Sequence, residues 1–308
     1  MMRRGAADRT WLIALAAALW GFSGLLRAPL SRAYPSTSVV LWEHLFLVVL
    51  VSPLLPGAIR ALRRSSARTV VAVLVIGGGS SALATTLFTA AFAYGDPISP
   101  QVLQKLQPLL AIGLAALLLG ERVRGRFWLF AVPALAGAWL MAFPNPLQVG
   151  IRSLVPALLG VGAAALWALG TVLGRAVSAQ LTFWQVTALR FAGGFVALVI
   201  INAALGTPMI MPVSTWGSIL SLALIPGLAA LLLYYHGLRR TAASRATLAE
   251  LAFPLTAALV GVTLLGASLA PSQWVGLGVV LVSVVALALH EQRAERPAVR
   301  VPQPARTD

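Results

Sequence analysis

Polar side chains recur at helical spacing inside one apolar stretch of this 308-residue chain. Gln101, Gln104 and Lys105 stand at positions i, i+3 and i+4, and Pro108 follows at i+7, so in an α-helix they share one face. A charged group inside a membrane span costs roughly 2.5 to 3.5 kcal/mol on insertion scales, so such a face points into a helix bundle. We therefore expect Gln101, Gln104 and Lys105 to line a substrate cavity. The alternative is that Lys105, the only lysine, extends to the nearer membrane surface or is structural.

A second polar group appears when the chain is compared with itself at a shift of 146 residues. Glu250 then falls on Gln104, and Thr247 lies one turn before it, so both are expected to face the same cavity from the other half of the protein. A carboxyl buried in a span can bind and release a proton near neutral pH, which would couple transport to a proton gradient. The alternative is that Glu250 lies at a membrane end and pairs with Arg239 or Arg245.

Two further charged residues lie inside apolar stretches. Arg190 is deep enough to need a partner, and an anionic substrate group, a structural carboxylate or helix-end carbonyl groups would all serve. Glu43, beside His44, lies about one turn inside its stretch, so an ion pair with Arg32 and a role in coupling are both open.

Helix-breaking residues occupy corresponding positions in the two halves of the chain. Gly78 and Gly79 of the third apolar stretch correspond to Pro226 and Gly227 of the eighth. Paired interruptions of this kind indicate broken helices whose freed amides and carbonyls can bind a ligand. Close packing of helices through small residues is the alternative.

Ten apolar stretches must position these residues, and each is close to the ~20 residues that cross ~30 Å of hydrocarbon as a helix. Their continuous hydrophobicity excludes a β-barrel, so the fold class is an all-α polytopic membrane protein with ten transmembrane helices. The stretches run over residues 11–30, 39–56, 70–94, 99–119, 127–143, 154–177, 183–205, 216–238, 243–265 and 273–289.

Composition limits the function. With 59% hydrophobic and 10% charged residues, the chain has no room for a soluble catalytic domain. Arginines beside apolar stretches indicate the orientation of membrane helices rather than nucleic-acid binding. The absence of cysteine excludes disulfides, thiolate metal sites and thiol nucleophiles, so we expect neither a metal nor a cofactor. The polar tail at residues 291–308 is expected to be disordered and cytoplasmic.

The basic residues fall in every second connection. With the N-terminus placed in the cytoplasm, 18 of the 23 Lys and Arg residues are cytoplasmic, and only Arg27, Arg32 and Arg152 lie on the opposite side. This bias predicts an inner (plasma) membrane protein with both termini cytoplasmic.

An internal repeat organises the chain. At a shift of 146 or 147 residues Trp20 coincides with Trp167, and further pairs coincide at positions 79 and 226, 108 and 254, 120 and 266, and 128 and 274. Five stretches lie in each copy, so the second copy enters the membrane in the opposite sense, as in many secondary transporters. We expect repeats at residues 11–144 and 153–290. Trp20 and Trp167 would flank the cavity or belong to aromatic belts at the membrane interfaces.

The order and spacing of several motifs resemble the drug/metabolite transporter superfamily, of the type with two EamA domains. The motifs are ALWG at 18–21, ALWALG at 165–170, QPLLAIGLAALLLGER at 107–122, ALRFAGG at 188–194 and FPLTAALVGVTLLG at 253–266. The resemblance implies a ten-helix carrier of small metabolites that works without ATP. The family often ends the fourth helix of each repeat with Gly-Glu; Gly120 and Glu121 keep that pair, whereas Ala267 follows Gly266.

These observations predict a secondary transporter that moves an amino acid or related small metabolite by alternating access and could be proton-coupled. An enzyme is disfavoured because the histidines are scattered and the chain contains no HExxH or GxSxG motif. A channel is disfavoured because no ring of like charges appears. Translocation of a lipid or lipid-linked intermediate is the remaining alternative. The substrate, the direction of transport and the oligomeric state are left open.

Overall fold

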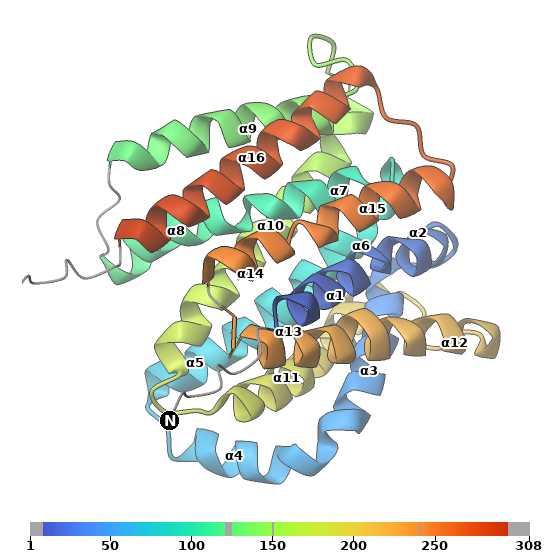
Figure 1. The fold of residues 1–308 in the computed structure, drawn as a ribbon. Helices are drawn as coiled ribbons and strands as arrows, with labels where there is room; N and C mark the ends of the chain where they lie inside the picture. Colours follow the sequence, from blue (N-terminus) through green and yellow to red (C-terminus); the bar gives the residue numbers. More distant parts are fainter. Residues whose placement is uncertain (1–8, 121–124, 150, 239, 242, 295–308) are drawn as a thin grey trace, which may run out of the picture.

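Backbone amides in hydrocarbon have no water to bond, and the apolar stretches accordingly fold as helices in the computed structural model of the chain (Figure 1). The structure describes residues 9–120, 125–149, 151–238, 240–241 and 243–294. Within these residues nine helical segments are long and apolar enough to cross a membrane, and a tenth apolar segment is shorter. The expected all-α polytopic protein with ten membrane helices is confirmed.

The segments are numbered here as spans 1 to 10. In the first half, span 1 is α1 (Thr10–Gly21) and α2 (Ser23–Ala33), span 2 is α3 (Ser36–Val51) and α4 (Leu55–Arg63), span 3 is α5 (Ala67–Val75) and α6 (Ala84–Tyr94), span 4 is α7 (Ser99–Leu103) and α8 (Gln107–Leu119), and span 5 is α9 (Trp128–Ala142). In the second half, span 6 is α10 (Ile151–Val177), span 7 is α11 (Phe183–Leu205), span 8 is α12 (Val213–Leu222) and α13 (Ala230–Leu238), span 9 is α14 (Ala243–Ala249) and α15 (Ala252–Thr263), and span 10 is α16 (Pro271–Ala294).

Two boundaries differ from expectation. The ninth stretch is not a continuous helix, because a turn at Glu250 and Leu251 separates α14 from α15. The last helix continues to Ala294, four residues into the expected tail, and the remainder of that tail lies outside the described residues. Glycines with left-handed backbone follow the fourth helix of both halves, Gly120 with φ 69° and Gly266 with φ 63°, as glycine-capped helix ends require.

Helices of the two halves pack across each other in a two-fold pattern. In span 1, α1 packs against α13 and α15 of spans 8 and 9, and in span 6, α10 packs against α6 and α8 of spans 3 and 4. Span 2 packs against span 7, and span 5 against span 10. These are the pairings that a pseudo-two-fold axis between the repeats produces, and they leave spans 1, 3, 4, 6, 8 and 9 around the centre.

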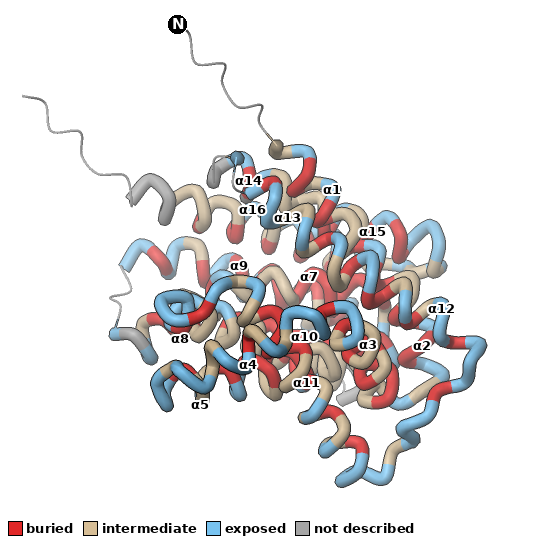
Figure 2. Tube along the Cα trace, turned by 90° about the horizontal axis from the view of Figure 1, so that it is seen from below, coloured by how far each residue is buried: buried red, intermediate tan, exposed pale blue. Residues whose placement is uncertain are grey.

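The pair formed by α9 and α16 lies at one edge of the bundle (Figure 1). Its backbones touch at Gly137 and Gly276: a Cβ atom on Gly276 would lie 2.6 Å from the Gly137 carbonyl oxygen. Gln273 of α16 donates a hydrogen bond of 3.0 Å to the Met141 carbonyl of α9. Figure 2 shows buried residues where helices face one another and exposed residues on the outside of the bundle.

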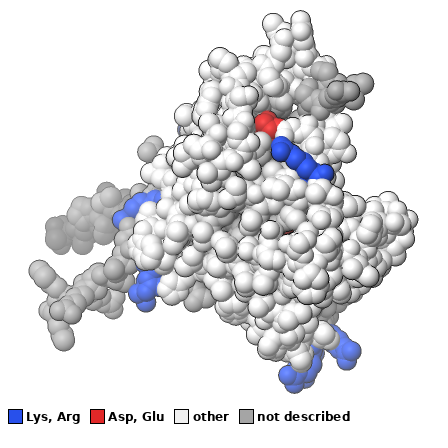
Figure 3. Space-filling view, turned by 90° about the vertical axis from the view of Figure 1, so that its right-hand side faces the viewer, with Lys and Arg blue, Asp and Glu red and all other residues white. Residues whose placement is uncertain are grey.

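The two ends of the bundle differ in charge. We call the end that carries the connection from span 2 to span 3, with Arg60, Arg63, Arg64 and Arg68 on or beside it, the inner end, and the opposite one the outer end. Figure 3, which views the outer end, shows few charged side chains there. The placement of Arg27 outside the spans is wrong, because Arg27 lies within α2 and is only 6% exposed.

The two ends of the bundle differ in one contact made by the first span of each repeat. At the outer end α2 contacts α6, α12 and α15, so span 1 joins both halves. In the second repeat α10 makes the corresponding contacts with α5 and α8, but α10 and α13, which correspond to α2 and α6, make no comparable contact among the described residues. The outer end is therefore closed between spans 1 and 3, and the inner end is more open between spans 6 and 8.

Candidate functional site

A cavity of about 300 Å³ lies between spans 4, 6, 9 and 10. Its inner side is formed by residues from the inner halves of spans 4, 6 and 10. Polar groups come from both repeats, and the apolar wall comes largely from α16. The lining residues are Gln104, Lys105, Gln107, Pro108, Ala111, Thr171, Glu250, Leu251, Leu281, Val284 and Val285.

An ion pair across the two repeats occupies this cavity. Lys105 Nζ lies 3.9 Å from Glu250 Oε2, and the side chains are 19% and 35% exposed. Lys105 also lies 4.8 Å from the centre of the Phe253 ring, which is cation–π contact. The alternative that Lys105 extends to the membrane surface does not describe this structure.

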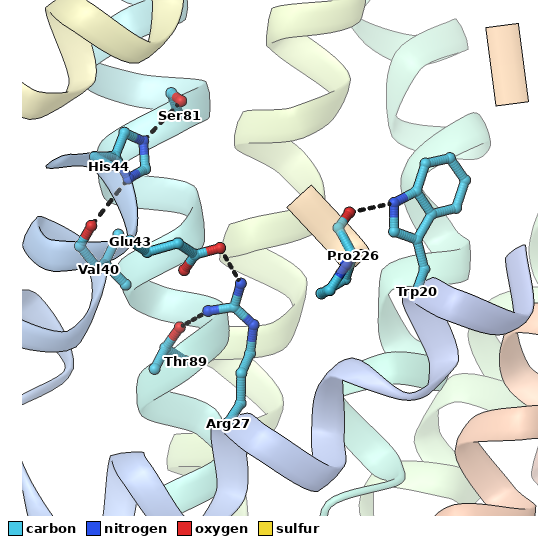
Figure 4. Close-up of polar contacts among 8 residues, drawn as sticks. All are labelled: Trp20, Arg27, Val40, Glu43, His44, Ser81, Thr89 and Pro226. Carbon is cyan, nitrogen blue, oxygen red and sulfur yellow. Dashed lines mark hydrogen bonds and ion pairs between the residues drawn. The ribbon is translucent and has the colours of Figure 1, made fainter. Parts of the chain in front are cut away.

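A chain of contacts leads from the ion pair to the first span. The Tyr234 hydroxyl donates a 2.6 Å hydrogen bond to Glu250 Oε1, and the Tyr234 ring lies 5.2 Å from the Trp20 ring. Trp20 Nε1 in turn donates to the Pro226 carbonyl at 2.9 Å (Figure 4). Spans 1, 4, 8 and 9 are therefore linked through one set of side chains.

Backbone irregularities hold the ion pair at corresponding places in the two repeats. Gln104–Leu106 form a 3-10 turn between α7 and α8, and Glu250 and Leu251 form the turn between α14 and α15. A shift of 146 residues places Gln104 on Glu250. Helix interruptions inside a membrane are tolerated where they line a cavity, which is where both of these lie.

The second pair of irregularities is π-helical. Residues Ile76–Leu83 of span 3 and Ala223–Ala229 of span 8 are π turns that contain Gly78, Gly79, Pro226 and Gly227. The helices widen there but do not separate, and both the Trp20 indole and the Ser80 hydroxyl bond across to a neighbouring span. π turns are common at functional sites.

The two tryptophans of the repeat pack against corresponding residues. The Trp20 ring is tilted against Tyr234, and Trp167 meets Phe88 edge-on at 5.1 Å; a shift of 146 places Phe88 on Tyr234. Thr171, which lines the cavity, donates to the Trp167 carbonyl at 3.0 Å. The Trp20 indole is tied to the ion pair, whereas the Trp167 ring packs in an apolar cluster with Phe88.

Not every expected residue reaches this cavity. Gln101 is buried beside Gly24 and donates to the Pro97 carbonyl at 2.9 Å, because the 3-10 turn breaks the regular spacing that would align it with Lys105. The side chain of Thr247 and all of Glu121 lie outside the described residues. The same holds for Arg239, one of the two arginines considered as a partner for Glu250.

A separate buried network lies in the outer half (Figure 4). Arg27 Nη2 donates to Glu43 Oε1 at 2.7 Å, and Arg27 Nη1 donates to the Thr89 hydroxyl at 2.7 Å. The two charged side chains are 7% and 5% exposed. Glu43 therefore pairs with Arg27 and not with Arg32, and the network connects spans 1, 2 and 3.

His44 is fully enclosed next to this network. Its Nδ1 donates to the Val40 carbonyl at 3.0 Å, so in the neutral ring Nε2 accepts from the Ser81 hydroxyl at 2.9 Å (Figure 4). The ring also packs against Gly194 of span 7.

Arg190 lies on the opposite side of the pseudo-two-fold axis, in the inner half of span 7. Its Nε is buried without a hydrogen-bond partner, and no described residue forms an ion pair with it. Its nearest recorded contact is the ring of Phe191, 5.5 Å from the guanidinium carbon. Neither the structural carboxylate nor the helix-end carbonyl considered as partners is present among the described residues.

Sequence reasoning did not find Tyr234, Phe253 or Arg27. Tyr234 and Phe253 stand in apolar runs where single aromatic residues carry no periodic signal. The repeat contains one signal for Tyr234. Tyr234 corresponds to Phe88, and only Tyr234 has the hydroxyl that donates to Glu250.

Two inverted five-helix repeats with a cavity that receives charged groups from both repeats form the architecture of a membrane transporter. The model of the EamA-like transporter family matches residues 10–143 and 154–289, and the chain belongs to this family.

Similar proteins carry transporter names. The chain is 29% identical to riboflavin transporter ImpX of Fusobacterium nucleatum subsp. nucleatum over 90% of its length and 96% of that protein. It is 30% identical to uncharacterized transporter YwfM of Bacillus subtilis over 68% of its length and 71% of that protein. A crystal structure with 20% sequence identity superposes with a TM-score of 0.59, covering 94% of this chain and 99% of the other, and shows the same fold.

Proposed function

We propose that the protein is a secondary transporter that moves a small organic metabolite across the plasma membrane by alternating access, with both termini in the cytoplasm. The observation that carries this proposal is the Lys105–Glu250 ion pair, which joins the two repeats within a cavity. A pair at 3.9 Å is longer than a hydrogen-bonded pair, so polar groups of a solute can replace it with two shorter contacts.

The Lys105–Glu250 ion pair also supports alternating access. Lys105 belongs to the first repeat and Glu250 to the second, and both lie beside breaks in their helices. When a solute takes over one or both partners, the contact that holds the repeats in this relative position is weakened, and the halves can rock about the cavity.

Proton coupling would use Glu250. Its carboxylate accepts a hydrogen bond from the Tyr234 hydroxyl and lies beside the Lys105 ammonium group. When Lys105 turns to the substrate, the carboxylate loses its counter-charge inside the membrane, and proton uptake then compensates for that loss. An imposed pH gradient tests this step.

We propose an amino acid or a related compound as the substrate. Gln104, Lys105 and Glu250 bring an amide and both charges to the cavity, and Leu281, Val284 and Val285 form an apolar wall. The similarity to a protein named as a riboflavin transporter makes flavins the first compounds to compare with amino acids.

Lipid translocation is the second candidate, and one observation favours it. The wall contributed by Leu281, Val284 and Val285 is apolar and belongs to span 10, at the edge of the bundle. A carrier of a lipid-linked intermediate would hold an acyl chain against such a wall.

Uptake and counterflow in proteoliposomes test the proposal. The purified protein is supplied with labelled amino acids, riboflavin and related metabolites, with and without a pH gradient, beside the Lys105→Ala variant. We expect saturable exchange of at least one soluble compound and its loss in the variant. Absence of flux for every soluble compound, together with translocation of a fluorescent lipid-linked probe, would replace this proposal by the second candidate.

A further inference from the structure

Five charged side chains among the described residues lie more than one helical turn inside the ends of their spans. They are Arg27, Glu43, Lys105, Arg190 and Glu250. Arg27 pairs with Glu43, and Lys105 pairs with Glu250. Arg190 is left over, so the described interior carries one uncompensated positive charge. An arginine inside a membrane is strongly disfavoured without a partner, which makes this position functional by default.

The repeat shows which residue stands at the position of the missing partner. A shift of 147 residues places Glu43 on Arg190 and Arg27 on Gly174, and a shift of 146 places Thr89 on Tyr235. The position of span 6 that corresponds to Arg27 is thus a glycine, so the second repeat has no side chain there that could pair with Arg190.

The position of Gly174 also has space. A Cβ atom added to Gly174 would meet no atom within 4 Å, whereas Arg27 at the related position is enclosed and hydrogen-bonded. The Tyr235 ring lies 4.4 Å from the ring of Phe183, which stands two helical turns before Arg190 on α11. A hydroxyl group and an unpaired guanidinium therefore belong to the same inner part of spans 7 and 8.

From this arrangement we infer that Arg190 binds an anionic group, a carboxylate or a phosphate, of the transported molecule in the inner half of the pathway. A guanidinium presents paired N–H donors that match both groups. The negative charge of the bound group neutralises the unpaired positive charge of Arg190. This inference rests on the proposed transport function and adds the substrate class: an organic anion with one net negative charge.

An anionic lipid headgroup also presents a carboxylate or phosphate to a guanidinium. The inference commits to a solute because Arg190 Nε is itself buried within the bundle. The two sources are separated by comparing liposomes of phosphatidylcholine alone with liposomes that also contain phosphatidylglycerol.

The test uses the full-length protein with Arg190→Gln, Arg190→Lys and, as a matched control, Arg60→Gln at the exposed inner end. Counterflow is measured with a panel of labelled anionic, zwitterionic and neutral metabolites. We expect the wild type and Arg60→Gln to prefer anions, Arg190→Gln to raise the half-saturating anion concentration about tenfold or more, and Arg190→Lys to recover part of the loss, because a charged hydrogen bond is lost and then partly restored.

Three results would overturn the inference. An unchanged half-saturating anion concentration in Arg190→Gln would show that Arg190 binds no substrate group. An effect of Arg190→Gln that appears only with phosphatidylglycerol would assign the site to lipid. Equal losses for anionic and neutral compounds in both Arg190 variants would indicate a structural role.

A binding measurement separates failure of this inference from failure of the proposed function. If the wild type transports nothing, thermal unfolding in a neutral detergent is followed with inorganic phosphate and with benzoate as probes. A rise in Tm that is present in the wild type and in Arg60→Gln but absent in Arg190→Gln supports the anion site without transport. An equal response in all three proteins contradicts it.

Discussion

At the scale of residues, the Lys105–Glu250 pair makes a prediction about coupling. Lys105→Met and Glu250→Gln should each lower counterflow at least tenfold, because each removes one half of a charged contact inside the membrane and leaves the other half uncompensated. The double variant should fall no further than the worse single variant, since partners in one contact are not additive. Losses that multiply in the double variant would show that the two residues act independently.

The Tyr234 hydroxyl gives a second prediction at this scale. Tyr234→Phe should lower the free energy of unfolding in detergent by about 1 to 2 kcal/mol, because a hydrogen bond to a charged group is lost. Tyr94→Phe is the matched control, since Tyr94 is 60% exposed, and it should stay within about 0.5 kcal/mol of the wild type. Denaturant titrations followed by tryptophan fluorescence measure both. A loss of unfolding free energy in Tyr234→Phe as small as that in Tyr94→Phe would contradict the hydrogen bond between Tyr234 and Glu250.

The sequence predicts part of the site and misses the rest for identifiable reasons. Helical spacing and the repeat bring Gln104, Lys105 and Glu250 to one cavity, as expected. The same spacing misplaces Gln101, because a 3-10 turn cannot be distinguished from an α-helix by hydrophobicity. The Arg27–Glu43 pair depends on how three spans pack, which no local pattern contains.

At the scale of elements, the edge pair of α9 and α16 depends on backbone contact. Gly276→Ala should cost about 1 to 3 kcal/mol of stability, since the added Cβ would lie 2.6 Å from two backbone atoms that cannot move independently of their helix. Gly278→Ala, two residues away on α16, meets no atom within 4 Å and should be neutral or slightly stabilising. Thermal unfolding in detergent compares the two, and equal Tm values would contradict the close approach.

The elements were the easiest part of the fold to predict. Hydropathy finds all ten spans because each must be apolar over a membrane thickness. It does not find the turn that divides α14 from α15, since one glutamate in a span looks the same whether the helix is broken or continuous there. The π turns leave a trace in the sequence only as glycine and proline, which also occur in unbroken membrane helices.

At the scale of the whole molecule, the distribution of arginines predicts orientation. The absence of cysteine allows single labels to be introduced directly. Asn145→Cys, between spans 5 and 6, should react with a membrane-impermeant maleimide in intact cells, whereas Ala67→Cys, at the inner end of span 3, should react only after permeabilisation. The reverse pattern of labelling would invert the assigned topology.

The closed outer end has a consequence for measurements made from one side. In the proposed transport cycle, a solute supplied at the inner end would meet an accessible cavity, whereas one supplied at the outer end would bind only those molecules in which Arg27, Glu43 and Thr89 have separated. The apparent dissociation constant is the intrinsic one divided by the fraction in the competent state. If about one molecule in ten is open outward, right-side-out and inside-out vesicles will report half-saturation values that differ about tenfold for one and the same site.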